Sequence, residues 1–138
     1  MSRTALALLL SSCACLLGCG QIDHTRHCRT VARLVNGRLD QIEAMNKSGP
    51  KRKDYGKIAV AYDVLGRDLE SLRVPDAKLS AELPEVAKVF TRSAGAVRRA
   101  ARAEDHHDVI MLDQAARELE RLDQRHRALV HKLDAICR

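Results

Sequence analysis

Apolar residues recur at steps of three and four along most of the chain, and this spacing constrains the fold more than any other feature. No segment shows the every-second-residue alternation of a half-buried strand. The clearest run comprises Tyr55, Ile58, Tyr62, Leu65, Leu69 and Leu72. The pattern predicts an all-α protein with four long helices, at residues 23–46, 52–73, 76–103 and 105–138.

Helix-breaking residues separate these segments. Ser48-Gly49-Pro50 and Val74-Pro75-Asp76 end the first and second. Within the third, Pro84 predicts either a kink or a separate turn over residues 76–83, because proline removes a backbone hydrogen bond from a helix interior.

The last helix is predicted to begin at Asp105. An aspartate there would cap the helix, with Asp108 adding negative charge to the first turn. His106 and His107 would then lie exposed in that turn, and the apolar stripe would begin at Val109.

Long helices joined by short breaks favour antiparallel neighbours. The simplest arrangement is an up-down-up-down four-helix bundle in which every apolar stripe faces one shared core. The alternative is a long antiparallel coiled-coil hairpin that dimerises.

The N-terminus has the organisation of an export signal. Arg3 precedes an uncharged run over residues 4–17, which is shorter than the roughly 20 residues of a membrane-spanning helix. Leu16-Leu17-Gly18-Cys19 follows and resembles the lipobox of bacterial lipoproteins. The competing cysteine, Cys13, has too short an apolar run before it.

The resemblance implies a diacylglycerol thioether, and usually a further palmitate-type acyl chain, on Cys19. Residues 1–18 would be a signal peptide that is removed, 19–27 a short lipid-anchored tether, and 28–138 the helical domain. The protein would lie on the periplasmic side of a cell membrane. Gly20, where an aspartate resembles an inner-membrane retention signal, favours the outer membrane of a Gram-negative cell.

Five cysteines are present, and the lipobox accounts for three of them. Cys13 and Cys15 would leave with the signal peptide and Cys19 would carry lipid. The remaining pair, Cys28 and Cys137, would lie in an oxidising compartment and at the same end of an up-down-up-down bundle. Both arguments predict one disulfide that closes the bundle.

The six histidines raise the possibility of a metal or haem site. His24, His27 and His131 would lie near one end of the bundle and are the candidate ligands for a transition metal. Non-covalent haem would need an inward-facing methionine, such as Met45 or Met111, and a histidine. His126 lies near the apolar stripe and is predicted to be a core histidine with its hydrogen bonds satisfied. No cofactor is the first interpretation, because metal-ligand spacings of the His-Glu-x-x-His kind are missing from the sequence.

The net charge of +6 falls to +5 without Arg3, which suits a protein beside anionic lipid. Two tyrosines, one phenylalanine and no tryptophan give little surface for stacking nucleic-acid bases. Two basic clusters are candidate contacts for an anionic envelope polymer or a protein: Lys51, Arg52 and Lys53, and Arg98, Arg99 and Arg102.

Catalytic motifs are also missing from the sequence: it has neither a glycine-rich phosphate loop nor a nucleophile elbow. We therefore expect a non-enzymatic binding or structural protein, lipid-anchored in the cell envelope. The alternative function is a metal- or haem-binding periplasmic four-helix bundle.

Overall fold

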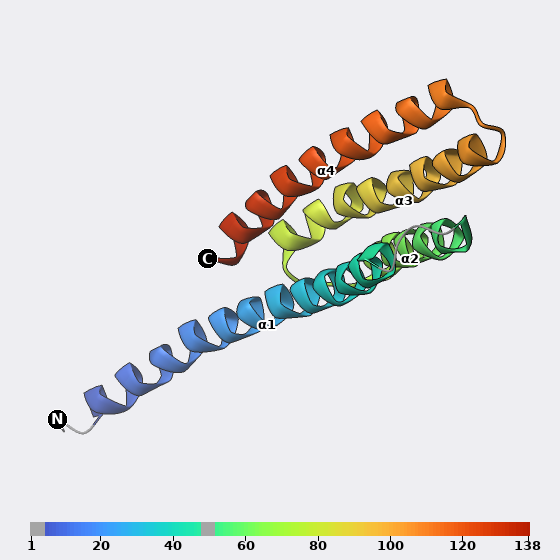
Figure 1. Ribbon diagram of the computed structural model, residues 1–138. Helices are drawn as coiled ribbons and strands as arrows, with labels where there is room; N and C mark the ends of the chain where they lie inside the picture. The colour runs from blue at the N-terminus through green and yellow to red at the C-terminus, as the bar shows by residue number, and fades with distance from the viewer. Residues whose placement is uncertain (1–4, 48–51) are drawn as a thin grey trace.

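A computed structural model describes the backbone of residues 5–47 and 52–138 and the side chains of residues 20–47 and 54–138. The described backbone forms four helices and no strand: α1 (Ala5–Lys47), α2 (Arg52–Ser71), α3 (Ala77–Asp105) and α4 (Val109–Cys137). Figure 1 shows the helices lying lengthwise beside one another. The predicted all-α class and the number of helices are confirmed.

Helix α1 is much longer than the predicted 23–46. It begins at Ala5 and passes through residues 18–28 without a break. Alanine and leucine, which dominate its first half, are strong helix formers, and that half contains no proline. In Figure 1 this N-terminal part extends past the ends of the other three helices. None of the helices in the described part is long and apolar enough to cross a membrane.

Helix α3 is continuous through Pro84, so residues 76–83 do not form a separate turn. Asp76 caps the helix, with its carboxylate accepting a hydrogen bond from the Leu79 N–H at 2.9 Å. Pro84 is exposed, as is Ser80, whose carbonyl loses its helical partner to the proline. Solvent can therefore hydrate that carbonyl, and the helix tolerates the proline.

The start of α4 differs from the prediction. Asp105 is the last residue of α3, and Asp108 caps α4 by accepting a hydrogen bond from the Met111 N–H at 2.9 Å. His107 has a φ of 52°, a left-handed conformation that reverses the chain between the two helices. Val109 is 75% exposed and does not begin the buried stripe.

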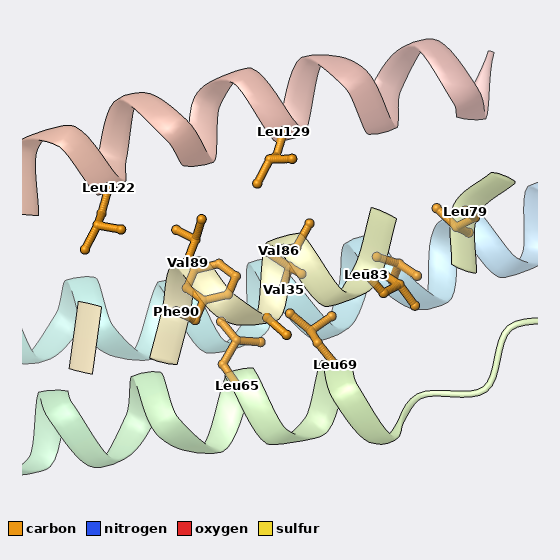
Figure 2. Close-up of a cluster of buried hydrophobic side chains, with 12 residues drawn as sticks. Val35, Leu65, Leu69, Leu79, Leu83, Val86, Val89, Phe90, Leu122 and Leu129 are labelled. Carbon is orange, nitrogen blue, oxygen red and sulfur yellow. The ribbon is translucent and has the colours of Figure 1, made fainter. Parts of the chain in front are cut away.

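All four helices contribute side chains to the core (Figure 2). Phe90 is 1% exposed and packs between Tyr62, at 6.1 Å between ring centroids, and His126, at 5.2 Å. Around it lie mainly aliphatic side chains: Val31 and Val35 of α1, Leu65 and Leu69 of α2, Leu79, Leu83, Val86 and Val89 of α3, and Leu122 and Leu129 of α4. A second cluster continues the core around Ile42, Ile58 and Val97.

The helices are not packed equally well. Helix α3 packs extensively against both α2 and α4, whereas α1 packs mainly against α2 and only sparsely against α4. Helices α2 and α3 approach closely at Gly66, where an added Cβ would lie 2.6 Å from Thr91 Oγ1 and 3.2 Å from the Ala87 carbonyl oxygen. Ion pairs link α3 to α4, among them Glu82–Lys132, Glu85–Arg125 and Arg99–Glu118.

A disulfide joins the two sparsely packed helices. Cys28 of α1 and Cys137 of α4 are bonded at 2.03 Å between sulfurs, with their Cα atoms 5.9 Å apart. This confirms the predicted pairing. The bond holds α1 against α4 where side-chain packing does little to do so.

Candidate functional site

His24 lies at the centre of a polar cluster beside the disulfide. Its Nδ1 is 2.5 Å from Asp76 Oδ2, and its Nε2 is 3.0 Å from the carbonyl oxygen of Ile136. Cys28 Sγ is 3.9 Å from the same Nε2. The cluster, which we call the His24 clasp, thus joins α1, the cap of α3 and the end of α4.

The hydrogen-bonding roles in the His24 clasp are fixed by its partners. A carboxylate and a carbonyl both accept hydrogen bonds, so a His24 nitrogen that bonds to either of them does so as an N–H donor. The Leu79 N–H, and then His24, hold the pKa of Asp76 below its usual range. The Ile136 carbonyl is one of the last four of α4, which have no partner within the helix.

The histidines proposed as metal ligands do not converge. The ring nitrogens of His24 are engaged within the clasp, His27 is half-buried on α1, and His131 is exposed on α4. Across the described side chains, no three His, Cys, Asp or Glu residues are grouped so that they could hold a metal ion. Of the two methionines considered for haem, Met45 packs against the second core cluster and Met111 lies in the first turn of α4.

Two described residues of the predicted basic clusters form ion pairs between helices of the bundle. Arg98 pairs with Asp63 of α2, and Arg99 pairs with Glu118 of α4. Arg102 is exposed near the end of α3. In the other cluster, Lys51 and the side chains of Arg52 and Lys53 lie outside the described part.

A hollow of about 370 Å³ runs along the α1–α4 seam. Aliphatic side chains form most of its wall, including Val31 and Val35 of α1 and Leu129 and Leu133 of α4. A second hollow of about 280 Å³ lies farther along the same seam and reaches Tyr55 of α2. Both hollows follow from the sparse packing of α1 against α4.

His126 lines both hollows, and its environment differs from the predicted one. Its Nε2 is buried and has no hydrogen-bond partner, so the expectation that its hydrogen bonds are satisfied was wrong. Burial lowers the pKa of His126, against an opposing effect of Asp123. The ring is therefore neutral at pH 7, and its Nε2 is an unpaired polar atom in the protein interior.

Sequence spacing contains part of this information. His126 follows Leu122 by four residues and precedes Leu129 by three, so it lies on the buried stripe of α4. The missing partner cannot be read from that spacing, because it depends on which side chains face His126 from α1 and α3.

Two large aliphatic side chains are exposed at the other end of the bundle from the His24 clasp. Val109 and Ile110, at the start of α4, are 75% and 74% exposed. Adjacent aliphatic residues with this exposure are unusual in a hydrophilic surface and are a common feature of contact sites. The apolar spacing did not predict the exposure of Val109, because that residue fits the start of a buried stripe. We call them the apolar corner.

In comparisons with protein-family models, with curated proteins and with solved structures, nothing matches this chain.

Proposed function

We propose that this chain is a bacterial lipoprotein whose helical bundle is a non-enzymatic binding protein of the cell envelope. Leu16-Leu17-Gly18-Cys19 supports the anchor, since this motif behind a charged start and an apolar run is typical of lipoprotein signals. Gly20 supports the outer membrane. Two lipid attachments hold a protein at a membrane stably, whereas a single acyl chain does so only marginally.

The bundle is proposed to have up-down-up-down topology. Contacts at its two ends support this order. The His24 clasp brings together the middle of α1, the start of α3 and the end of α4. Tyr55, in the first turn of α2, donates a hydrogen bond to Glu104 near the end of α3 at 3.2 Å.

The apolar corner is the observation that carries the binding function. With Cys19 nine residues before Cys28, the His24 clasp would face the membrane and the apolar corner would face away from it. The exposed Arg102 lies near the end of α3, beside the turn to α4. A protein partner that offers apolar and acidic side chains would suit this surface better than a purely anionic polymer, because Arg98 and Arg99 are already paired.

The anchor is tested by metabolic labelling with an alkyne-bearing palmitate analogue. The wild type and Cys13→Ala should incorporate the label, and Cys19→Ala should not. The intact mass of the mature protein should correspond to residues 19–138 with acyl groups. Labelling that survives Cys19→Ala would contradict the anchor without bearing on the bundle.

The partner is tested by placing a photo-crosslinking amino acid at Ile110 in cells. We expect a discrete crosslinked product there and none at Val60, which is also exposed, at 56%, but lies on α2. The product should disappear when Val109 is replaced by Asp. Equal products at both positions, or none at either, would contradict a binding role for the apolar corner.

Haem binding is the second candidate function, and the unpartnered Nε2 of His126 is the observation that favours it. Imidazole is a common haem ligand. A histidine-dependent Soret band in protein from its own membranes would establish this alternative.

A further inference from the structure

A row of exposed side chains follows the outer face of α1. It comprises Ile22, Arg26, Arg29 and Arg33, and we call it the basic stripe. Steps of four, three and four residues keep these positions within about 60° of one another around the helix. Val31, one of the buried residues of α1, lies on the opposite side of the helix. The basic stripe therefore faces away from the core.

The positive charge of the basic stripe is not neutralised within the bundle. No ion pair joins Arg26, Arg29 or Arg33 to any described side chain. Arg33 donates a hydrogen bond to the Arg29 carbonyl oxygen, which leaves its charge unpaired. By contrast, Arg38 of the same helix pairs with Asp68 of α2. The stripe thus presents guanidinium groups that can bind an external anion.

The surroundings of the basic stripe contain little negative charge. From residue 24 to residue 39 the sequence has no Asp or Glu. Neither Asp23 nor Asp134 of α4, which lines a hollow together with Arg29, forms an ion pair with the stripe. The side chains that flank it are uncharged: Gln21, Thr25, Ala32, Asn36 and Gly37. A negatively charged surface can therefore approach the arginines without meeting a carboxylate on this face.

The basic stripe begins next to the proposed lipid attachment. Cys19 precedes Ile22 by three residues and Arg26 by seven. Helix α1 is continuous through this segment, so Arg26 lies about 10 Å, and Arg33 about 21 Å, from Cys19 along the helix axis. Seven residues are close to two helical turns, so Cys19, Arg26 and Arg33 recur on one side of α1. A membrane that holds a lipid on Cys19 would lie beside the stripe.

This position favours a lipid over an acidic protein as the anion. A few exposed arginines alone bind an anionic surface weakly, because salt screens solvent-exposed charges. A lipid on Cys19 would keep the membrane head groups beside the basic stripe, so the second contact becomes intramolecular and needs little affinity of its own.

We propose that the basic stripe binds the phosphate groups of anionic phospholipids in the membrane that holds Cys19, which draws this part of α1 to the membrane surface. A guanidinium group stays charged at physiological pH and binds phosphate through paired N–H donors. Ile22, which is 70% exposed, adds an apolar side chain of the kind that enters the boundary between head groups and acyl chains. The apolar corner, at the other end of the bundle, stays available to a protein. The inference rests on the proposed lipid anchor.

The test is arginine footprinting of the mature lipoprotein, purified from its own membranes and reconstituted in vesicles. Phenylglyoxal modification is followed by mass spectrometry in phosphatidylcholine vesicles, with and without about 30% phosphatidylglycerol. We expect Arg26, Arg29 and Arg33 to react at least threefold more slowly in the anionic vesicles, and about 0.5 M NaCl to remove the difference. Arg67 of α2 and Arg121 of α4, which are exposed and lack ion pairs, are internal controls and should react equally in both.

A pair of matched variants tests whether the arginines act together. In Arg26→Gln with Arg33→Gln, the remaining Arg29 should lose its protection in anionic vesicles. Arg67→Gln with Arg121→Gln removes the same charge elsewhere and should leave Arg29 protected. The helical circular dichroism signal and migration of the oxidised form on a non-reducing gel report that each variant folds. Equal protection of Arg29 in both folded variants would contradict the proposal.

The outcomes separate the basic stripe from the anchor. Intact mass and flotation with neutral vesicles report acylation of Cys19 without involving the arginines. An acylated chain that floats but shows no protection in anionic vesicles would refute the stripe alone. A chain without acyl groups would refute the anchor, and the proposal with it. Protection in native membranes but not in phosphatidylglycerol vesicles would assign the stripe to an acidic protein and overturn the lipid contact.

Discussion

At the scale of single residues, His24 and His126 show how one side-chain type serves two purposes in one bundle. His24 meets two hydrogen-bond acceptors and ties three elements together. His126 lines both hollows, and its buried Nε2 meets no hydrogen-bond partner. The first arrangement stabilises the fold, whereas an unpaired buried polar atom costs free energy unless a ligand satisfies it.

Replacement of His24 by Ala should therefore lower the free energy of unfolding, by about 1–2 kcal/mol, because two hydrogen bonds across helices are lost. His131→Ala is the control, since His131 is exposed and its loss should change the free energy by less than about 0.5 kcal/mol. Urea unfolding monitored by circular dichroism measures both. Equal effects of the two substitutions would show that the clasp contributes no stability.

The lowered pKa of Asp76 predicts how this stability depends on pH. The folded state binds the Asp76 proton less readily than the unfolded state, so the contribution is present above the ordinary carboxyl pKa of about 3.9. It is lost as the pH falls through the lower pKa of the folded state. Asp76→Asn should therefore be less stable than the wild type at pH 7, and the difference should shrink toward pH 2. A difference that grows on acidification would contradict this assignment.

At the scale of elements, the sequence predicted which segments are helical better than it predicted where each helix begins and ends. The three- and four-residue spacing predicted all four helices, because periodicity reflects the buried face directly. The predicted cap of α4, Asp105, was wrong, because either aspartate can accept the capping hydrogen bond and the spacing does not distinguish them. The left-handed conformation of His107 sets the cap at Asp108, and sequence seldom reveals such a conformation outside glycine.

Replacing Gly66 of α2 and Gly95 of α3 by alanine should have opposite effects on stability. Gly66→Ala should destabilise the protein, because its Cβ would meet the Ala87 carbonyl as well as the Thr91 hydroxyl. Gly95→Ala places its Cβ 3.6 Å from the flexible end of Arg99. It should stabilise the protein by up to about 1 kcal/mol through helix propensity. Thermal melts of the two variants check the sign of each effect, and a stabilised Gly66→Ala would refute the close approach.

At the scale of the whole molecule, α3 is the central helix and α1 is the least embedded. The candidate site follows from this asymmetry, because the seam hollows lie where α1 and α4 pack sparsely. Sequence reasoning predicted the disulfide but not the seam, since packing between distant helices has no local signature. For the same reason the sequence did not show that Arg98 and Arg99 are paired within the bundle. Their partners, Asp63 and Glu118, are 35 and 19 residues away in the sequence.

Loss of the disulfide should therefore affect α1 most. Reduction, or Cys28→Ser with Cys137→Ser, should lower the free energy of unfolding by about 2–5 kcal/mol, the range found for long loops. Hydrogen exchange should show lost protection in α1 while α3 stays protected. Dithiothreitol should have no effect on the double variant, which serves as the control. Uniform loss of protection in all four helices would contradict the asymmetry.

The disulfide spans a sequence separation of 109 residues, and this has a consequence for the order of biogenesis. Helix α1 is the first to be synthesised, yet the disulfide that closes it onto α4 cannot form until residue 137 has been made. Until then the nascent chain exposes the apolar face of α1, including Val31 and Val35, or shields it only through α2. A chaperone or oxidase that acts on this protein would therefore encounter it when translation is almost finished and α1 is not yet bonded to α4 by the disulfide.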